Sequence, residues 1–390
     1  MNKKNNTLAL LAAAATNLTG LQAEAAQVAD NYQIGVRHYN YEEEPTVDFS
    51  GEKKDRYDID VNQFSLIAPL SEQFELSLSY QHEKMSGASP WYTFQLDDKP
   101  VQLLSGASIQ DTRDDASAKL RYVTDLNSFA VNAAFSDEDD YQSASYGVEY
   151  QRESADKIST YGISADFSND EIEAVDADLY FTRPQEKQTK HSSSLLLSYS
   201  TILNKNALIQ VSAGYSRKTG YLSDPYKMVL ANFSLLGDSR PEKRIAKTLA
   251  ARYRHFVEVA NAALHVDYRY YDDTWAVKSH TFDIAWYQNL SHGFQLIPSV
   301  RMYSQSDSYF YEGFYAEARD DNYYSTDYRL SEYGGYTYGL KIVKSFGDWV
   351  VNVSSEKYKS AGDYGFADAD VENPSLVDFK ILSLGIDYQF

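Results

Sequence analysis

The chain has 390 residues and a formal net charge of -20 at pH 7, with an isoelectric point near 4.7. A chain this acidic lacks the basic face that binding to phosphates requires. Nucleic acid is therefore excluded as a partner. It contains no cysteine, which excludes a lipoprotein anchor, disulfide bonds, thiolate metal sites and haem attached through cysteine.

The first 26 residues predict a secretory signal peptide, with the mature domain spanning 27–390. Lys3 and Lys4 are followed by a short apolar run at 8–15 and by small residues around Ala25, as in cleaved signals. Beyond this segment no apolar run is long enough for a transmembrane helix, and the mean hydropathy is -0.51. Membrane-spanning strands need no such run, because only alternate residues face lipid.

Alternation of apolar and polar residues predicts about sixteen strands, and no helical pattern of comparable strength is present. Their lengths suit a tilted crossing of a bilayer, and an even number returns both termini to one side. The predicted strands are 30–41, 56–68, 74–85, 112–124, 128–137, 141–153, 157–168, 190–201, 207–218, 245–256, 262–271, 278–290, 294–305, 333–345, 349–359 and 377–390.

The connections alternate in length, which indicates the orientation of the barrel. Short turns of outer-membrane barrels face the periplasm and long loops face the exterior, so both termini are expected in the periplasm. The short turns are 69–73, 125–127, 154–156, 204–206, 258–261, 291–293 and 346–348, and the long loops are 86–110, 169–189, 219–244, 306–332 and 360–376.

The last strand indicates where the protein resides. Leu384, Ile386, Tyr388 and Phe390 share one face, and the chain ends on the phenylalanine. This pattern resembles the signal by which Gram-negative outer-membrane barrels are handed to their assembly machinery. The strand is expected to close the barrel against 30–41, because an unpaired edge cannot face lipid.

These signals predict an all-β fold, a closed antiparallel transmembrane β-barrel of about 16 strands in the outer membrane of a Gram-negative bacterium. A soluble sandwich shows the same alternation but does not explain the loop lengths together with both termini. An aromatic girdle is expected at the periplasmic end, formed by Phe74, Tyr122, Phe129, Tyr199, Phe294, Trp349 and Phe390, because aromatic rings favour the membrane interface.

Many of the strand positions that are expected to face the lumen carry ionisable residues. One hypothesis is a basic constriction that selects anionic solutes, since charged rings set selectivity in aqueous pores. The alternative is that these residues pair laterally along the wall as structural ladders. The candidates are Lys119, Arg121, Arg252, Arg254, His265, Asp267, Arg269, Asp283 and Arg301.

No catalytic, cofactor or metal site is expected. Ser279 and His280 are adjacent on a strand and therefore point to opposite faces, so they cannot share one site without a bulge. The carboxylates at 137–140 suit hard cations but lack the spacing of a calcium loop. They are interpreted as solvated loop charge bridged to lipopolysaccharide.

Several stretches resemble an uncharacterised family of Gram-negative outer-membrane β-barrel proteins, known only as a domain of unknown function. They include Ser-Gly-Ala-Ser-Pro-Trp at 86–91, Gly-Tyr-Leu-Ser-Asp-Pro-Tyr-Lys at 220–227 and Ser-Arg-Pro-Glu-Lys-Arg at 239–244. Others are Tyr-Arg-Tyr-Tyr-Asp-Asp-Thr-Trp at 268–275, Ser-His-Thr at 279–281 and Asp-Tyr-Arg-Leu-Ser at 327–331. The resemblance spans nearly the whole mature chain and implies location and fold, with no substrate or catalytic residues. It also implies a link to an envelope redox or maturation system, because such genes often neighbour one for a flavin-attaching transferase.

Two functions remain open from the sequence. The first is a porin-like or substrate-specific channel for small solutes. The second is a docking component for periplasmic or surface protein partners, carried by loops rich in tyrosine and phenylalanine, which could also fold inward as a plug. A surface hydrolase is less favoured. The expected partners are outer-membrane lipid, lipopolysaccharide and the barrel assembly machinery.

Overall fold

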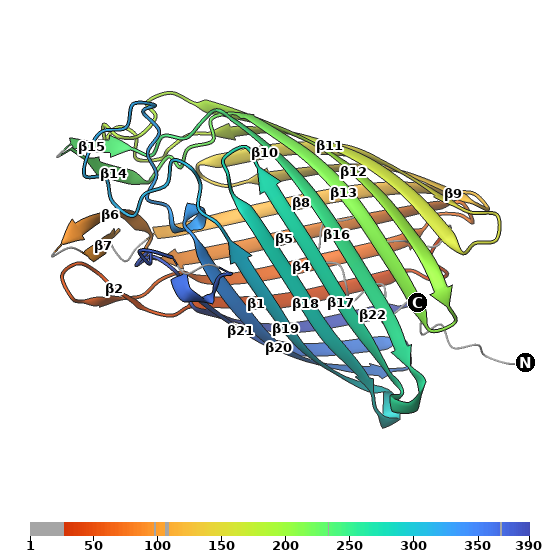
Figure 1. The fold of residues 1–390 in the computed structure, drawn as a ribbon. Helices are drawn as coiled ribbons and strands as arrows, with labels where there is room; N and C mark the ends of the chain where they lie inside the picture. The colour runs from red at the N-terminus through yellow and green to blue at the C-terminus, as the bar shows by residue number, and fades with distance from the viewer. Residues whose placement is uncertain (1–26, 97–98, 106–108, 233, 367–368) are drawn as a thin grey trace, which may run out of the picture.

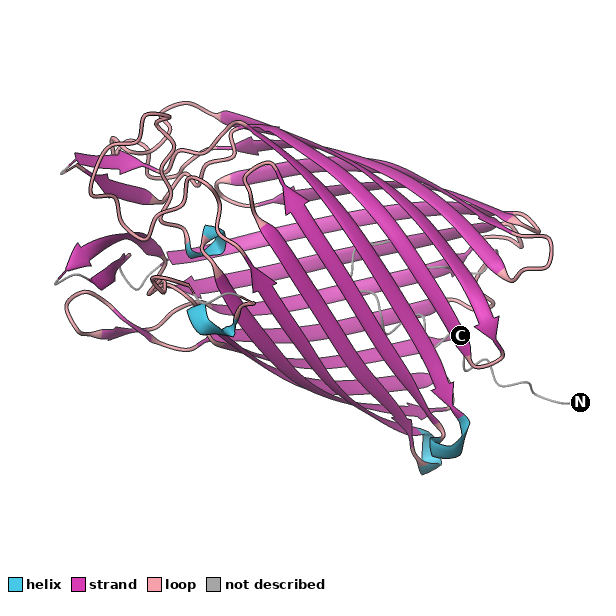
Figure 2. Cartoon of the chain, viewed as in Figure 1, coloured by secondary structure: helices cyan, strands magenta, loops and turns pink. Residues whose placement is uncertain are grey.

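The computed structural model describes residues 27–96, 99–105, 109–232, 234–366 and 369–390. Sixteen antiparallel strands form a closed barrel (Figures 1 and 2), as predicted. Within the described residues, no helix has the length and apolarity needed to span a membrane. The wall strands are β1 (Gln33–Glu43), β4 (Asp58–Pro69), β5 (Phe74–Gly87), β8 (Ile109–Val123), β9 (Asn127–Asp137), β10 (Tyr141–Glu153), β11 (Ser159–Ile172), β12 (Gln188–Asn204), β13 (Ala207–Gly220), β16 (Lys243–Val257), β17 (Ala262–Asp273), β18 (Lys278–Asn289), β19 (Phe294–Gln305), β20 (Tyr333–Phe346), β21 (Trp349–Ala361) and β22 (Phe379–Gln389).

The barrel closes between its first and last strands. β1 pairs with β22 in the register Gln33↔Gln389 through Glu43↔Phe379, which confirms the predicted seam. On the lumen side Arg37 donates to Asp387 at 2.8 Å across the seam. Every wall strand therefore has two hydrogen-bonded neighbours, and no edge faces lipid.

The two faces of the wall differ in polarity as the alternation predicts. Outward-facing apolar side chains remain exposed, including Val353 at 53% and Leu384 at 46%. At the short-turn end, exposed rings touch one another: Phe74 lies 4.9 Å from Tyr122, and Trp349 lies 4.5 Å from Tyr388, between ring centroids. An aromatic band of this kind is typical of a membrane interface.

The C-terminus lies at the end of the barrel that carries the short turns, opposite the long loops (Figure 1). The first described residues lie beside it, because the Phe390 amide donates to the Tyr32 carbonyl at 3.1 Å. Two of the short turns are 3-10 helices, η1 (Glu258–Ala260) and η2 (Ser291–Gly293). Short connections are not confined to this end, because the β9–β10 and β17–β18 connections at the opposite end are also short. Loop length alternates only in part because neighbouring strands that extend beyond the membrane can be joined by a tight turn.

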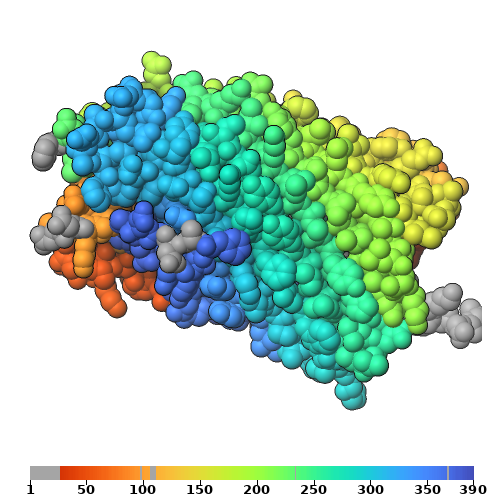
Figure 3. Space-filling model, in the orientation of Figure 1, coloured from red at the N-terminus to blue at the C-terminus, as the bar shows by residue number. Residues whose placement is uncertain are grey.

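The long loops are more ordered than the sequence suggests. They carry three hairpins, β2 (Thr46–Val47) with β3 (Lys53–Lys54), β6 (Pro90–Leu96) with β7 (Lys99–Leu104), and β14 (Met228–Ala231) with β15 (Ser234–Gly237). Loop 306–332 contains the 3-10 helix η3 (Tyr328–Leu330), and a further one, η4 (Gly362–Tyr364), follows β21. Loops from distant parts of the chain mass together at this end (Figure 3). We call this assembly the cap. Its short strands escaped prediction because they are too brief to show a period.

Loop-to-loop contacts hold the cap together. The Thr93 hydroxyl donates to the Gly313 carbonyl at 2.5 Å, and Ser239 and Tyr324 exchange two backbone hydrogen bonds of 2.9 and 2.8 Å. Two small apolar clusters lie beneath, one around Val229 and Tyr315 and one around Phe310. Three of the loop aromatics, Phe310, Tyr315 and Tyr324, are thus buried between loops, whereas Tyr309 remains exposed.

The predicted signal peptide, residues 1–26, lies outside the described residues, and the boundary at residue 27 stays a prediction. The first described residues enter the barrel instead of hanging below it. The Ala29 amide donates to Glu75 at 2.7 Å, and Arg121 donates to the Gln27 carbonyl at 2.9 Å. The buried Val28 side chain completes this attachment.

The register of the seam predicts a specific crosslink. Directly opposite residues have Cα atoms about 4.5–5.5 Å apart, within the range that a disulfide spans. Because the chain has no cysteine of its own, Gln33→Cys with Gln389→Cys should form one disulfide on oxidation. Non-reducing gel electrophoresis of the denatured protein would show faster migration, reversed by reductant. The pair Gln33→Cys with Ser383→Cys, six residues out of register, should stay open; the opposite pattern contradicts this seam.

Candidate functional site

The principal cavity lies in the lumen, between the barrel wall and the cap, with a volume of about 1200 Å³. Tyr328 and Arg329 of η3 and Leu376 and Val377 before β22 form its cap side. The wall contributes mainly hydroxyl, amide, charged and tyrosine side chains. A polar cavity enclosed by an apolar outer wall is suited to a water-soluble ligand or solute.

The structure brings six of the nine predicted lumen residues to this cavity and leaves three outside it. Arg121, Arg254 and His265 lie closer to the short-turn end along their strands. The residues that line the cavity are Lys119, Arg252, Asp267, Arg269, Asp283 and Arg301.

Lateral ion pairs neutralise much of the predicted basic constriction. Lys119 lies 2.8 Å from Glu149, and Arg121 lies 3.0 Å from Glu75. Both partners share the lumen face of the wall, as in the structural ladders weighed against the constriction. Arg121 also holds the N-terminal segment, a contact that no sequence pattern indicates.

The same lateral pairing occurs on the other side of the lumen. Arg254 binds both carboxylate oxygens of Asp267, one of them at 2.9 Å, and Arg301 donates to Asp283 at 2.5 Å. Bidentate contacts of this kind fix both orientation and charge. Arg252 and Arg269 have no carboxylate within 4 Å among the described residues, so their charge is available to the cavity.

His265 takes no part in the cavity. Its ring centroid lies 4.0 Å from that of Tyr287, which belongs to a buried cluster with Ala263 and Ile297. It packs as a wall residue near the short-turn end.

The lumen side also carries an aromatic wall, which the sequence analysis did not predict. The Tyr358 and Phe379 rings stack at 4.5 Å, and Tyr41 lies 4.7 Å from Phe379. Tyr303 and Tyr333 are neighbours at 5.6 Å. All five line the cavity. The alternation of each strand could have predicted this wall, because each aromatic occupies a lumen-facing position where the strand otherwise carries polar residues.

A buried charge network joins the loops that cover the cavity. Arg240 donates to Asp238 at 2.6 Å and to Asp327 at 2.8 Å, so it links loop 221–242 to η3. Arg329 connects Asp327, at 2.5 Å, to Asp224, at 2.7 Å. The carboxylates of Asp238 and Asp327 are fully buried. This network is the main polar connection between the two loops.

The charges of the network decide the protonation of its acids. Burial would raise the pKa of Asp327, but the positive charges of Arg329, Lys227 and Arg240 outweigh burial and hold that pKa well below its usual range. Burial raises the pKa of Asp238 in spite of Arg240. Asp327, which contacts both arginines, is therefore kept as an anion.

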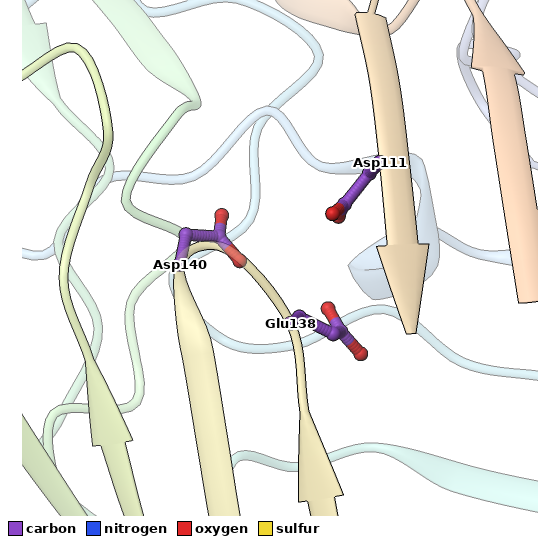
Figure 4. Close-up of side chains that lie close together, drawn as sticks. All are labelled: Asp111, Glu138 and Asp140. Atoms are coloured by element: carbon purple, nitrogen blue, oxygen red, sulfur yellow. The ribbon is translucent and has the colours of Figure 1, made fainter. Parts of the chain in front are cut away.

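Three carboxylates meet at the outer rim, close to the β9–β10 turn. The ligand oxygens of Asp111, Glu138 and Asp140 all lie within 4.8 Å of one another (Figure 4). Burial, then the charges of Asp111, Asp140 and Glu83, raise the pKa of Glu138 to about 6, although Arg113 opposes them. Of the carboxylates at 137–140, Asp137 and Asp139 are exposed to solvent as expected, whereas Glu138 and Asp140 are partly buried close to Asp111 of β8.

Ser279 and His280 lie on opposite sides of β18, as their adjacency implies. Ser279 is buried toward the lumen, whereas the His280 ring accepts or donates a hydrogen bond at 2.7 Å with Tyr268 on the outer face. The structure does not bring them together.

The closed wall, apolar outside and polar inside, defines the fold of an outer-membrane β-barrel. The chain belongs to the family described as protein of unknown function (DUF3570), which matches residues 6–369. No curated protein matches it.

Similarity to the solved structure of CdiB supports the fold alone. CdiB from Acinetobacter baumannii is 10% identical, with a TM-score of 0.52 over 93% of this chain and 60% of its own. The siderophore receptor PirA from Pseudomonas aeruginosa is 12% identical, with a TM-score of 0.42 over 86% of this chain and 57% of its own. A bacterial polysaccharide outer membrane secretin is 9% identical, with a TM-score of 0.49 over 93% and 99%. The chain thus spans less than two thirds of the length of CdiB and of PirA.

The charge network predicts that one carboxylate holds the cap closed. Asp327→Asn leaves Arg240 and Arg329 partly buried without their shared anion, and breaking a buried pair in this way costs about 3–5 kcal/mol. We expect trypsin to cleave the cap loops of the folded barrel much faster in this variant. Asp321→Asn, which removes only the exposed partner of Arg319, should leave cleavage unchanged. Equal rates for the two variants would contradict the role of Asp327.

The acidic rim predicts a pH dependence. Because the pKa of Glu138 is raised to about 6, protonation stabilises the folded turn fully below about pH 4.5, the usual value, and this stabilisation is lost as pH rises through 6. Amide hydrogen exchange at 138–141, corrected for intrinsic rates, should show more protection at pH 5 than at pH 7.5. Glu138→Gln should abolish the difference, while Glu52→Gln in an exposed loop should retain it. A difference that persists in Glu138→Gln argues against this assignment.

Proposed function

We propose that the protein is an outer-membrane channel for small polar solutes, with the lumen cavity as part of the solute path. The supporting observation is the cavity itself, about 1200 Å³ of space between the wall and the cap, which charged, hydroxyl, amide and tyrosine side chains line together with apolar ones. A barrel of this strand number is wide enough to hold an aqueous passage. The proposal includes no reaction and no cofactor.

The charges that remain free would set the preference of this channel. Lys119 and Arg301 share their charge with Glu149 and Asp283, so we assign anion preference to Arg252 and Arg269. The proposal also includes export by a signal peptide, delivery to the barrel assembly machinery through Leu384, Ile386, Tyr388 and Phe390, and contact with lipid and lipopolysaccharide.

A docking role is the second candidate, and one surface favours it. Loop 173–187 exposes Val175, Leu179 and Phe181 at 65%, 73% and 81%, and apolar side chains displayed together are typical of interaction surfaces. Through this loop, which lies at the exterior end, a docking component would bind a surface protein, and its lumen would not conduct. A periplasmic partner would have to bind the short-turn end.

Conductance in planar bilayers separates the two functions. We expect the purified protein alone to conduct, with a reversal potential in a potassium chloride gradient that indicates preference for chloride. Arg252→Gln with Arg269→Gln should shift that potential toward the potassium side, because two uncompensated charges are removed. Arg217→Gln, an arginine that does not line the cavity, is the control.

Absence of current without an added partner would overturn the channel and favour docking. Cation preference in the unaltered protein would overturn the assignment to Arg252 and Arg269.

A further inference from the structure

We propose that the lumen cavity is a binding site for acidic sugars, with Arg252 and Arg269 holding the sugar carboxylate. The inference deepens the proposed channel function by naming the solute class. It rests on that function only for the statement that the bound sugar is transported. Three separate features of the cavity lead to it.

The first feature is a local excess of positive charge on the wall. Residues 250–254, 265–269, 281–285 and 299–303 on β16 to β19 carry four arginines and two aspartates. Both aspartates are engaged, Asp267 by Arg254 and Asp283 by Arg301. Four cations less two anions leave two charges, and these belong to Arg252 and Arg269.

The second feature is the position of the two unengaged arginines relative to each other. Arg252 lies opposite Asp267, and Arg269 lies opposite Ala250, two residues along β16 from Arg252. They are therefore diagonal neighbours on adjacent strands, a spacing that long side chains bridge. Two guanidinium groups at this spacing can donate together to one carboxylate.

The third feature is the difference between the two flanks of the arginine pair. On one flank, β10 to β13 present hydroxyl, amide and carboxylate side chains, including Ser194, Gln210, Ser212 and Asp166. The hydroxyl and amide groups both donate and accept, the carboxylate accepts, and together they match a ligand with many hydroxyl groups. A simple inorganic anion would not use them.

The other flank is aromatic. Tyr303, Tyr333, Tyr358 and Phe379 of β19 to β22 line it with ring surfaces, and the three tyrosine rings end in hydroxyl groups. Gly335 makes room for this wall, since a Cβ there would lie 2.5 Å from the Tyr358 hydroxyl oxygen. Amphipathic rings suit the C–H faces of sugar rings, which are apolar on one side and polar at the edge. Charge, hydroxyl partners and ring faces together fit a hydroxylated organic acid better than acetate or a neutral sugar.

Titration calorimetry on the full-length protein in detergent tests the proposal without requiring current. The probes are galacturonic acid and its trimer, with galactose as the neutral match and acetate as the match without hydroxyls. We expect the galacturonates to bind most tightly. Arg252→Gln with Arg269→Gln should weaken their binding by roughly tenfold or more, and Arg217→Gln should leave it unchanged.

Tyr358→Leu separates the ring contribution from charge, since it should weaken galacturonate without altering acetate. The change of gel mobility on heating verifies that each variant is a folded barrel. The proposal is overturned if galactose or acetate binds as tightly as galacturonate, if benzoate does, or if the folded double variant binds normally. If the protein conducts but binds no galacturonate, the proposed binding site is wrong and the channel proposal stands. If it binds galacturonate but does not conduct, the channel proposal is wrong and the binding site stands.

Discussion

The structure depends on one constraint, that every backbone amide and carbonyl in the wall must find a partner within the sheet. In hydrocarbon there is no water to replace a missing hydrogen bond, and each unsatisfied group costs several kcal/mol. The pairing of β1 with β22 meets this requirement. Closure in turn creates an inside and an outside, and all later features of the molecule follow from that separation.

Separation of the faces determines what the charges can do. A charge on the outer face would meet lipid, so ionisable side chains gather on the inner face, where they lie close together in a polar lumen. Most then pair with a neighbour on the same wall, as Lys119 does with Glu149. Pairing fixes the wall and reduces the charge that a solute would meet. Arg252 and Arg269 stand out because the nearby aspartates already have partners.

The cap is built on a different principle from the wall. Its loops lie outside the membrane, where water can satisfy the backbone, and side-chain contacts between loops add to the backbone hydrogen bonds of its short hairpins. Asp327 and Arg240 connect two loops far apart in sequence, and Phe310 and Tyr315 are buried between loops. These two rings thus contribute to a core between loops. Other apolar side chains of the loops remain exposed, among them Tyr309, Phe366 and Phe181 of loop 173–187.

The sequence by itself determined the wall. Period-two alternation, turn residues and the terminal strand were sufficient to place all sixteen strands and the seam, because each of these signals is local and lipid makes the alternation strict. Only the tertiary structure decided which charges remain free. Arg254 and Arg252 lie on the same face of one strand and look equivalent in sequence, yet Asp267 binds the first and leaves the second. The folding of the cap was likewise hidden, because its contacts join residues such as Thr93 and Gly313 whose proximity depends on a closed barrel. Local pattern specifies which face a side chain occupies, and long-range geometry specifies its neighbour.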